Sequence, residues 1–156
     1  MATLRTRFFH SWFRLTRPLT LGVRAAVEDP GGRVFLVRHT YVNGWYLPGG
    51  GVEKAETHIE ALSRELMEEG GFRLTGEPDL VGIYSNHLVF PNDHVILCRV
   101  RPGMWEQGEA TSQGEIAETL WADPLAPPDG TTPGTRLRLA ELYGGAPRSP
   151  YWTPAS

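Results

Sequence analysis

The chain has 156 residues and a mass of 17.3 kDa, which suits a single domain with its own core. Its formal net charge is −3, so no basic excess favours general binding to nucleic-acid phosphates. Cys98 is the only cysteine, which excludes an internal disulfide framework and favours a reducing cytoplasm. No apolar run approaches the about 20 residues of a membrane-spanning helix, and we expect no membrane partner.

Residues 1–19 are predicted to contain an N-terminal amphipathic helix. Its apolar stripe, at helical spacing, consists of Leu4, Phe8, Phe9, Trp12, Phe13 and Leu15. The favoured interpretation is a helix that docks on its own domain or on a sister subunit of a homodimer. The alternative is a helix that binds a membrane surface or another partner. Arginine is frequent here, as in an organelle transit peptide, but Lys54 is the only lysine of the whole chain, so richness in arginine is general.

Residues 20–145 are predicted to form one mixed α+β domain. Runs of β-branched and apolar residues bounded by turns predict strands over 20–28, 33–40, 80–85, 95–100 and 115–122, with a short strand at 45–47. The triplet Gly49-Gly50-Gly51 is predicted to be a loop, and so is the segment 101–114. Residues 146–156 contain three prolines without periodicity and are expected to form a C-terminal tail outside the domain.

Two helices are predicted within this domain. The first follows Thr57, which can form a capping box with Glu60, and ends at Gly70-Gly71. The second follows Thr132 as its cap, begins with Pro133 and continues through 136–143. Helices among strands indicate an α+β fold in which helices pack against sheet.

The first of these helices carries an acidic patch. Glu65, Glu68 and Glu69 lie within an arc of about 100°, because spacings of three and four residues bring side chains together. A solvated acidic face, partly offset by Arg64, is the usual explanation for such a patch. The alternative is a divalent cation site, since carboxylate oxygens are the ligands that Mg²⁺ prefers. The glycines of 48–51 just upstream let the backbone approach a metal or phosphate, which favours the cation site.

The segment from Gly50 to Phe72 resembles the signature of the Nudix hydrolases, G-x5-E-x7-R-E-U-x-E-E-x-G-U, in which U is a bulky aliphatic residue. The matching residues are Gly50, Glu56, Arg64, Glu65, Leu66, Glu68, Glu69, Gly71 and Phe72. The one departure is the aromatic Phe72 at a packing position. The resemblance implies an α/β/α sandwich with a mixed β-sheet. It also implies an enzyme that cleaves the pyrophosphate of a nucleoside diphosphate linked to another moiety, by metal-assisted attack of water.

The resemblance implies roles for the acidic residues. Glu65, Glu68 and Glu69 would be ligands of Mg²⁺ or Mn²⁺, and the Gly49 carbonyl could complete the metal shell. Glu65 is alternatively the general base that deprotonates the attacking water, and Arg64 would orient it by a salt bridge. Hydrolysis of a pyrophosphate depends mainly on positioning and on neutralisation of charge by the metal.

Further site residues are expected around this core. Gly50, Gly51 and Glu56 are expected to bind the substrate, and Glu56 would also brace the loop. A further carboxylate often comes from a loop outside the signature, and the candidates are Glu106, Glu109, Glu115 and Glu118. We favour Glu115, although it could merely cap the strand that follows. The candidates for contact with a nucleotide base are Trp45, Tyr84, His87, Phe90 and Trp121.

The implied partner is a small nucleotide and not a specific nucleic-acid polymer. Nucleoside triphosphates (oxidised ones included), ADP-ribose and sugar nucleotides remain equally compatible with the sequence. A function from another class is a Nudix module that senses a nucleotide without catalysis. Because such modules tend to lose acids that Glu65, Glu68 and Glu69 still provide, the enzyme is the favoured hypothesis.

Overall fold

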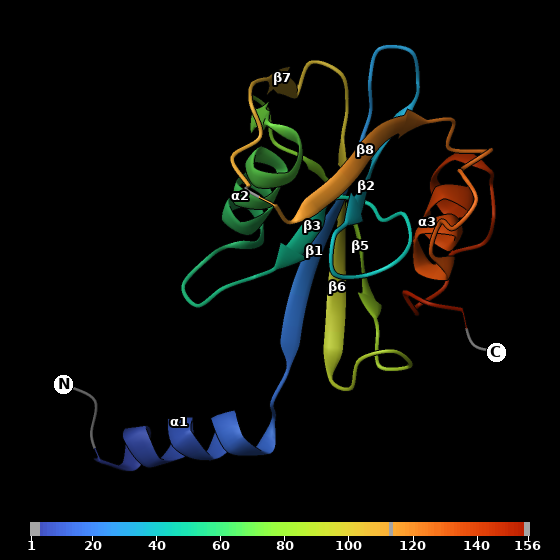
Figure 1. Cartoon of the computed structure of the whole chain (residues 1–156). Coiled ribbons are helices and arrows are strands. Elements are labelled where there is room, and N and C mark those ends of the chain that lie inside the picture. Colours follow the sequence, from blue (N-terminus) through green and yellow to red (C-terminus); the bar gives the residue numbers. More distant parts are fainter. Residues whose placement is uncertain (1–3, 113, 155–156) are drawn as a thin grey trace.

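The computed structural model describes residues 4–112 and 114–154, with the side chains of Leu4 and Arg5 also outside the description. Figure 1 shows the helices and strands, which in chain order are α1 (Leu4–Thr16), β1 (Thr20–Val27), β2 (Val34–His39), β3 (Gly49–Gly51), α2 (His58–Gly70), β4 (Phe72–Leu74), β5 (Asp79–Ser85), β6 (Asp93–Val100), β7 (Trp105–Gln107), β8 (Ile116–Ala122) and α3 (Pro133–Tyr143).

The largest sheet is mixed, as expected. Its strand order is β3-β1-β6-β5. The two central strands run parallel, from the pair Thr20↔Asp93 to the pair Val27↔Val100, and the outer strands pair antiparallel with them. Strands β2 and β8 form a separate antiparallel pair, and β4 and β7 form another.

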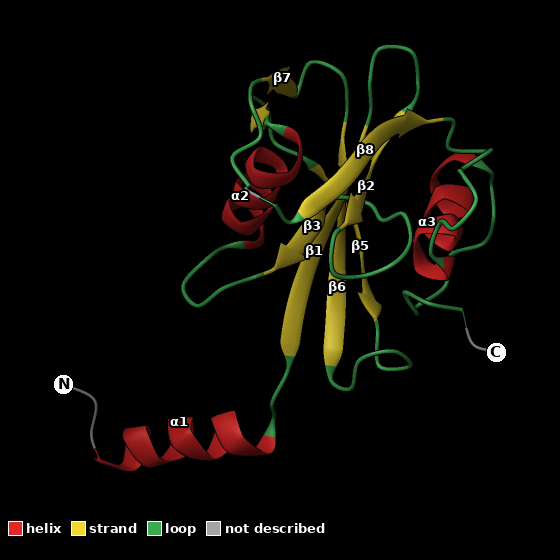
Figure 2. Ribbon diagram, viewed as in Figure 1, coloured by secondary structure: helices red, strands yellow, loops and turns green. Residues whose placement is uncertain are grey.

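The sheets lie between α2 and α3, which Figure 2 shows on opposite sides. Successive side chains of a strand point to opposite faces, so β1 contributes to two cores. Val23, Ala25 and Val27 belong to the core that includes Leu62 of α2, whereas Ala26 belongs to the core that includes Leu139 of α3. This arrangement confirms the expected α/β/α sandwich.

The structure corrects three local predictions. Gly49-Gly50-Gly51 is not a loop, because it pairs with β1 as strand β3, and backbone pairing outweighs the low strand propensity of glycine. The predicted strand at 45–47 is reduced to the isolated bridges Val37↔Tyr46 and Trp45↔Thr131. The predicted loop 101–114 contains β7, whose partner β4 is only three residues long and lacks a pattern of its own.

The predicted capping of α2 is confirmed. The Glu60 N–H donates to Thr57 Oγ1 at 3.1 Å, and the Thr57 N–H donates to the Glu60 carboxylate at 2.7 Å. Gly71 forms the C-cap and its N–H reaches the carbonyls of Leu66 and Met67. Helix α3 begins at Pro133 as expected, but Thr132 does not cap it through its side chain, because its hydroxyl pairs with that of Thr135 at 2.9 Å.

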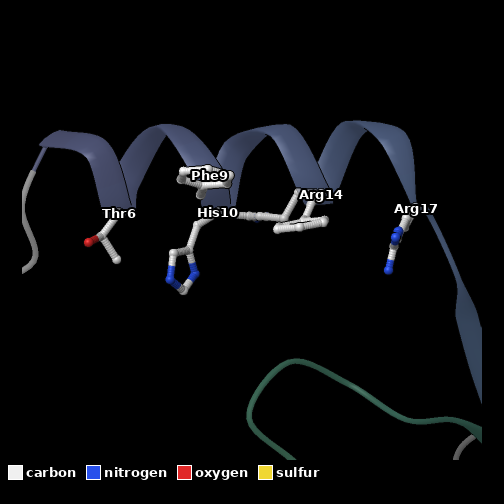
Figure 3. A pocket seen from close by; sticks show the side chains of 6 residues that line it. Thr6, Phe9, His10, Arg14 and Arg17 are labelled. Carbon is white, nitrogen blue, oxygen red and sulfur yellow. The ribbon is translucent and has the colours of Figure 1, made fainter.

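The stripe of α1 is exposed at Phe8, Phe9, Trp12, Phe13 and Leu15, while the Leu4 side chain lies outside the description. Figure 1 shows α1 extending away from the sheets, and Phe8 and Trp12 are 68% and 55% exposed. Docking of α1 on its own domain is therefore not what this structure shows. Figure 3 shows Thr6, His10 and Arg17 on one side of the helix, where they help to line an open hollow. None of the helices in the described ranges is long and apolar enough to cross a membrane.

Candidate active site

Strand β3 and helix α2 meet at Gly50 and Glu65. A Cβ atom on Gly50 would lie 2.4 Å from Glu65 Oε1, so only glycine lets the carboxylate rest against the strand. The first glycine of the signature is thus required by a contact with its second glutamate. Burial raises the pKa of Glu65, against the opposing effect of Arg64.

Arg64 connects the residues that surround this contact. Its Nε donates to Glu56 Oε1 at 2.8 Å, and its NH1 donates to Glu65 Oε1 at 2.7 Å. Its NH2 donates to the Gly51 carbonyl at 3.1 Å. The hydrogen bonds from Arg64 hold the pKa of the Glu56 carboxyl below its usual value. One guanidinium therefore fixes the loop before α2 and orients Glu65, as the resemblance implies.

Glu69 is the buried acid of the patch. Its side chain is 7% exposed, and its Oε2 accepts a hydrogen bond from the Gly49 N–H at 2.8 Å. Burial raises its pKa to about 7, although the Gly49 hydrogen bond and the charge of Arg24 oppose the rise. His39 Nε2 lies 3.7 Å from Glu69 Oε1, and burial lowers the pKa of that imidazole. No full positive charge pairs with this carboxylate at close range among the described residues.

These residues fit a hard divalent cation. A buried carboxylate without a cationic partner is costly, and a bound cation would compensate it. In residues 4–112 and 114–154, however, no three His, Cys, Asp or Glu side chains converge into a closed metal cluster. Mg²⁺ is commonly held by one or two carboxylates, with waters and substrate phosphates as its other ligands. Of the expected ligands, Glu69 has no arginine within salt-bridge distance in the described part of the chain, whereas Glu65 and Glu68 lie 2.7 and 3.6 Å from the Arg64 guanidinium.

Arg24, which was not predicted as a site residue, enters the site from β1. Its NH1 donates to the carbonyls of Leu47 and Gly49 at 2.9 and 3.0 Å. The Gly49 carbonyl, expected as a metal ligand, thus already accepts a hydrogen bond. The guanidinium also lies over the ring of Tyr46, 5.6 Å from its centroid. A charged residue inside a buried strand pattern, between Val23 and Ala25, was the signal that could have identified it.

A cavity of about 620 Å³ opens beside these residues. Its lining includes Arg24, Tyr46, Gly50, Gly51, Phe90 and Trp152, whereas Glu65, Glu68 and Glu69 are not among the lining residues. Its volume falls within the range of about 300–1,000 Å³ that small-molecule sites occupy. The glycines of the signature therefore face a space in which a nucleotide can fit.

Comparison with known proteins identifies the family. A model of the NUDIX domain matches residues 18–141, which is most of the chain. This chain is a member of the Nudix hydrolase family. The match confirms the resemblance that the signature indicated and the pyrophosphohydrolase class that it implies.

Relatives of this Nudix protein have different names. A MutT-like protein of Streptomyces ambofaciens is 34% identical over 127 residues, which cover 81% of this chain and 79% of that protein. An RNA pyrophosphohydrolase of Halorhodospira halophila is 47% identical over 51 residues, which cover 33% of this chain and 27% of that protein. The crystal structure of a MutT NUDIX hydrolase from Burkholderia pseudomallei superposes on this chain with a TM-score of 0.66 at 21% identity. The match covers 79% of this chain and 97% of that chain, which supports the fold.

The candidates for a further carboxylate in this Nudix domain differ in position. Glu115 lies near the site, because its carbonyl accepts a hydrogen bond from the Thr40 N–H at 2.9 Å, and its charge opposes the lowering of the His39 pKa by burial. Glu118 instead pairs with Arg38, and Glu106 pairs with Arg73. Glu109 is exposed in the loop that follows β7. Geometry therefore favours Glu115 among the four, as the sequence analysis did, while its catalytic role stays a prediction.

The aromatic candidates also separate. Trp121 packs against Phe35 and Phe72, with ring centroids 5.3 and 5.8 Å apart, and Tyr84 is 3% exposed, so both belong to the cores. Phe90 is the only one of the five that lines the described cavity. His87 packs on Tyr151, and Trp45 lines a separate shallow groove beside β8. Tyr46 and Trp152 line the cavity but were not among the candidates.

Proposed function

We propose that this Nudix hydrolase cleaves the pyrophosphate of a nucleotide with the help of Mg²⁺ or Mn²⁺. The single observation that carries the proposal is Glu69, a buried carboxylate with a raised pKa that is hydrogen-bonded to Gly49, the residue before the cavity-lining Gly50. Glu69 and Glu65 would hold the cation, with Glu68 as a third ligand. When bound, the cation would neutralise phosphate charge and favour the attack of water.

In this proposal the side chains divide the remaining work. Glu65 accepts the proton of the attacking water, and Arg64 keeps the Glu65 carboxylate in place through its hydrogen bond of 2.7 Å. Glu115 is the alternative acceptor. The water oxygen forms a bond to phosphorus, and the bond between that phosphorus and the bridging oxygen breaks. Arg24 lies beside Gly49 in the cavity wall and would contact a phosphate of the substrate.

A panel of nucleotides tests this function. Nucleoside triphosphates, 8-oxo-dGTP, ADP-ribose, UDP-glucose and RNA with a 5′-triphosphate would be incubated with Mg²⁺ or Mn²⁺, and the released phosphate, pyrophosphate or monophosphate would be measured. We expect turnover of at least one small nucleotide that requires the metal. Binding of a nucleotide without any turnover would support the sensing module instead. Turnover confined to the RNA would contradict the choice of a small nucleotide.

Two further parts of the proposal concern the cellular compartment and the oligomeric state of the enzyme. We place it in a reducing cytoplasm, for which the buried free thiol of Cys98 is the supporting observation. We also propose a homodimer in which a second copy covers the exposed stripe of α1, since Phe8, Phe9, Trp12 and Phe13 form an apolar surface that a partner would bury.

A further inference from the structure

The described part of the C-terminal tail, residues 146–154, is attached to the domain. The Ser85 N–H donates to the Pro150 carbonyl and the Trp152 N–H donates to the Ser85 carbonyl, each at 2.8 Å, which adds a short parallel pairing at the end of β5. From α3, Arg138 NH1 donates to the Tyr151 carbonyl at 2.8 Å. These contacts fix the backbone on both sides of Trp152. The tail was expected to lie outside the domain, but these contacts join it to β5 and α3.

The indole of Trp152 has a specific place in this arrangement. A Cβ atom on Gly134 would lie 2.5 Å from Trp152 Nε1, so the indole crosses the first turn of α3 where only glycine leaves room. The ring also meets Tyr84 edge to face, with centroids 5.8 Å apart, and the Arg138 guanidinium lies 5.5 Å from its centroid. The orientation of Trp152 is therefore set by residues of β5 and α3.

Trp152 and the neighbouring Thr153 line the same cavity as Gly50, Gly51 and Arg24. The cavity thus runs from the glycines of the signature to an aromatic side chain that lies beyond residues 18–141, the part matched by the family model. Phe90, from the turn between β5 and β6, is 55% exposed and lines the cavity as well. Phe90 and Trp152 thus add two aromatic side chains to a lining that also includes Asn86 and Asp93.

We propose that the C-terminal segment completes the nucleotide site, with Trp152 as the aromatic wall against which the base of the substrate packs. This inference rests on the proposed function, and it assigns recognition of the planar base of the substrate to Trp152. A phosphate bound near Arg24 would leave the nucleoside in the rest of the cavity, whose whole volume is about 620 Å³. Contact of a base with an aromatic ring contributes about 1–3 kcal/mol and accepts any base, because every base has a π face.

Equilibrium binding tests the wall directly. Inorganic pyrophosphate and the four common nucleoside 5′-monophosphates would be titrated calorimetrically into the parent with Mg²⁺ present, and then into Trp152→Ala, Trp152→Leu and Trp152→Phe. For Trp152→Ala and Trp152→Leu we expect the affinity for the monophosphates to fall about tenfold or more, while the affinity for pyrophosphate changes by less than about twofold. For Trp152→Phe we expect most of the affinity for the monophosphates to remain. Tyr151→Ala is the matched control, because Tyr151 lies in the same segment and does not line the cavity.

Each result decides the proposal. Equal loss of pyrophosphate and monophosphate would mean that Trp152 only supports the fold, and unchanged binding of monophosphates would place the base elsewhere. If Trp152→Ala fails to fold, the Leu and Phe variants give the same comparison. A parent that binds no nucleotide and hydrolyses none would overturn the proposed function itself and the wall with it. A parent that binds nucleotides while all three variants bind them equally well would overturn the wall alone.

Discussion

Glu69 of α2 accepts a hydrogen bond of 2.8 Å from the backbone N–H of Gly49 in β3. This contact ties the acidic patch to the glycine strand, and it places a carboxylate where burial raises its pKa to about 7. A carboxylate whose pKa is strongly raised by burial is frequently part of a functional site. The same hydrogen bond joins helix α2 to the glycine strand β3.

Replacement of Glu69 by glutamine tests its role as a cation ligand. Gln keeps the shape and can still accept the hydrogen bond from Gly49, but it removes the negative charge. We expect kcat to fall by at least about a hundredfold at saturating Mg²⁺. The matched control is Glu77→Gln at an exposed position outside the cavity lining, which should leave kcat unchanged. Near-normal turnover of Glu69→Gln would show that this buried carboxylate is not a ligand of the cation.

The raised pKa of Glu69 predicts a pH dependence of the metal-free protein. The folded state holds the proton more tightly than the unfolded chain, with a pKa of about 7 instead of 4.5. The stabilisation by this group is therefore complete below the lower value and is lost as the pH rises through the higher one. We expect the free energy of unfolding in urea to fall by about 3 kcal/mol over this interval, at about 1.4 kcal/mol per unit of pKa shift.

The control for that prediction is Glu69→Gln, which cannot ionise and should lose less stability over the same pH range. Above about pH 7 the variant should be as stable as the metal-free parent or more so. Adding Mg²⁺ should raise the melting temperature of the parent more than that of the variant, since only ligands that prefer the folded state stabilise it. Identical pH profiles for the two proteins would contradict the assignment.

Arg64→Lys tests the positioning of Glu65. Lysine carries one ammonium group and cannot reach Glu56, Glu65 and the Gly51 carbonyl together as the guanidinium does. We expect kcat to fall about tenfold or more while KM changes little, because a displaced carboxylate affects the transition state more than binding. Arg73→Lys is the matched control, since Arg73 pairs with Glu106 at an exposed position. A rise in KM alone would assign Arg64 to substrate binding.

Deletion of residues 1–17 tests the role of α1. Its aromatic stripe is exposed within the protomer, so we expect the melting temperature to change by less than about 2 °C at protein concentrations where both forms are monomeric, and we expect the metal requirement to persist. The homodimer predicts that the full chain has twice the mass of a protomer in solution and that the truncated chain is monomeric. A monomeric full chain would contradict the homodimer, and its retention on anionic vesicles would favour the membrane-surface alternative. A large loss of stability would show that α1 packs on the domain after all.

The sequence alone determined the features that depend on residues close together in the chain. The helix that begins after Thr57 and its acidic patch were predictable because capping and helical periodicity are local. The roles of Arg64 and Glu56 followed from the signature, and the structure places the two side chains in contact at 2.8 Å. The α+β class was predictable from the residue patterns of strands and helices, whereas the α/β/α sandwich with a mixed sheet was implied by the resemblance to the Nudix signature.

Tertiary structure decided what depends on partners far apart in the chain. The glycine triplet becomes a strand only because β1 offers it a backbone to pair with. Arg24 joins the site through carbonyls more than 20 residues away. Trp152 reaches the cavity because Gly134 leaves space for its ring. No local sequence pattern predicts these contacts, since each contact depends on the free energy of packing the whole chain and not only on the neighbouring residues in the sequence.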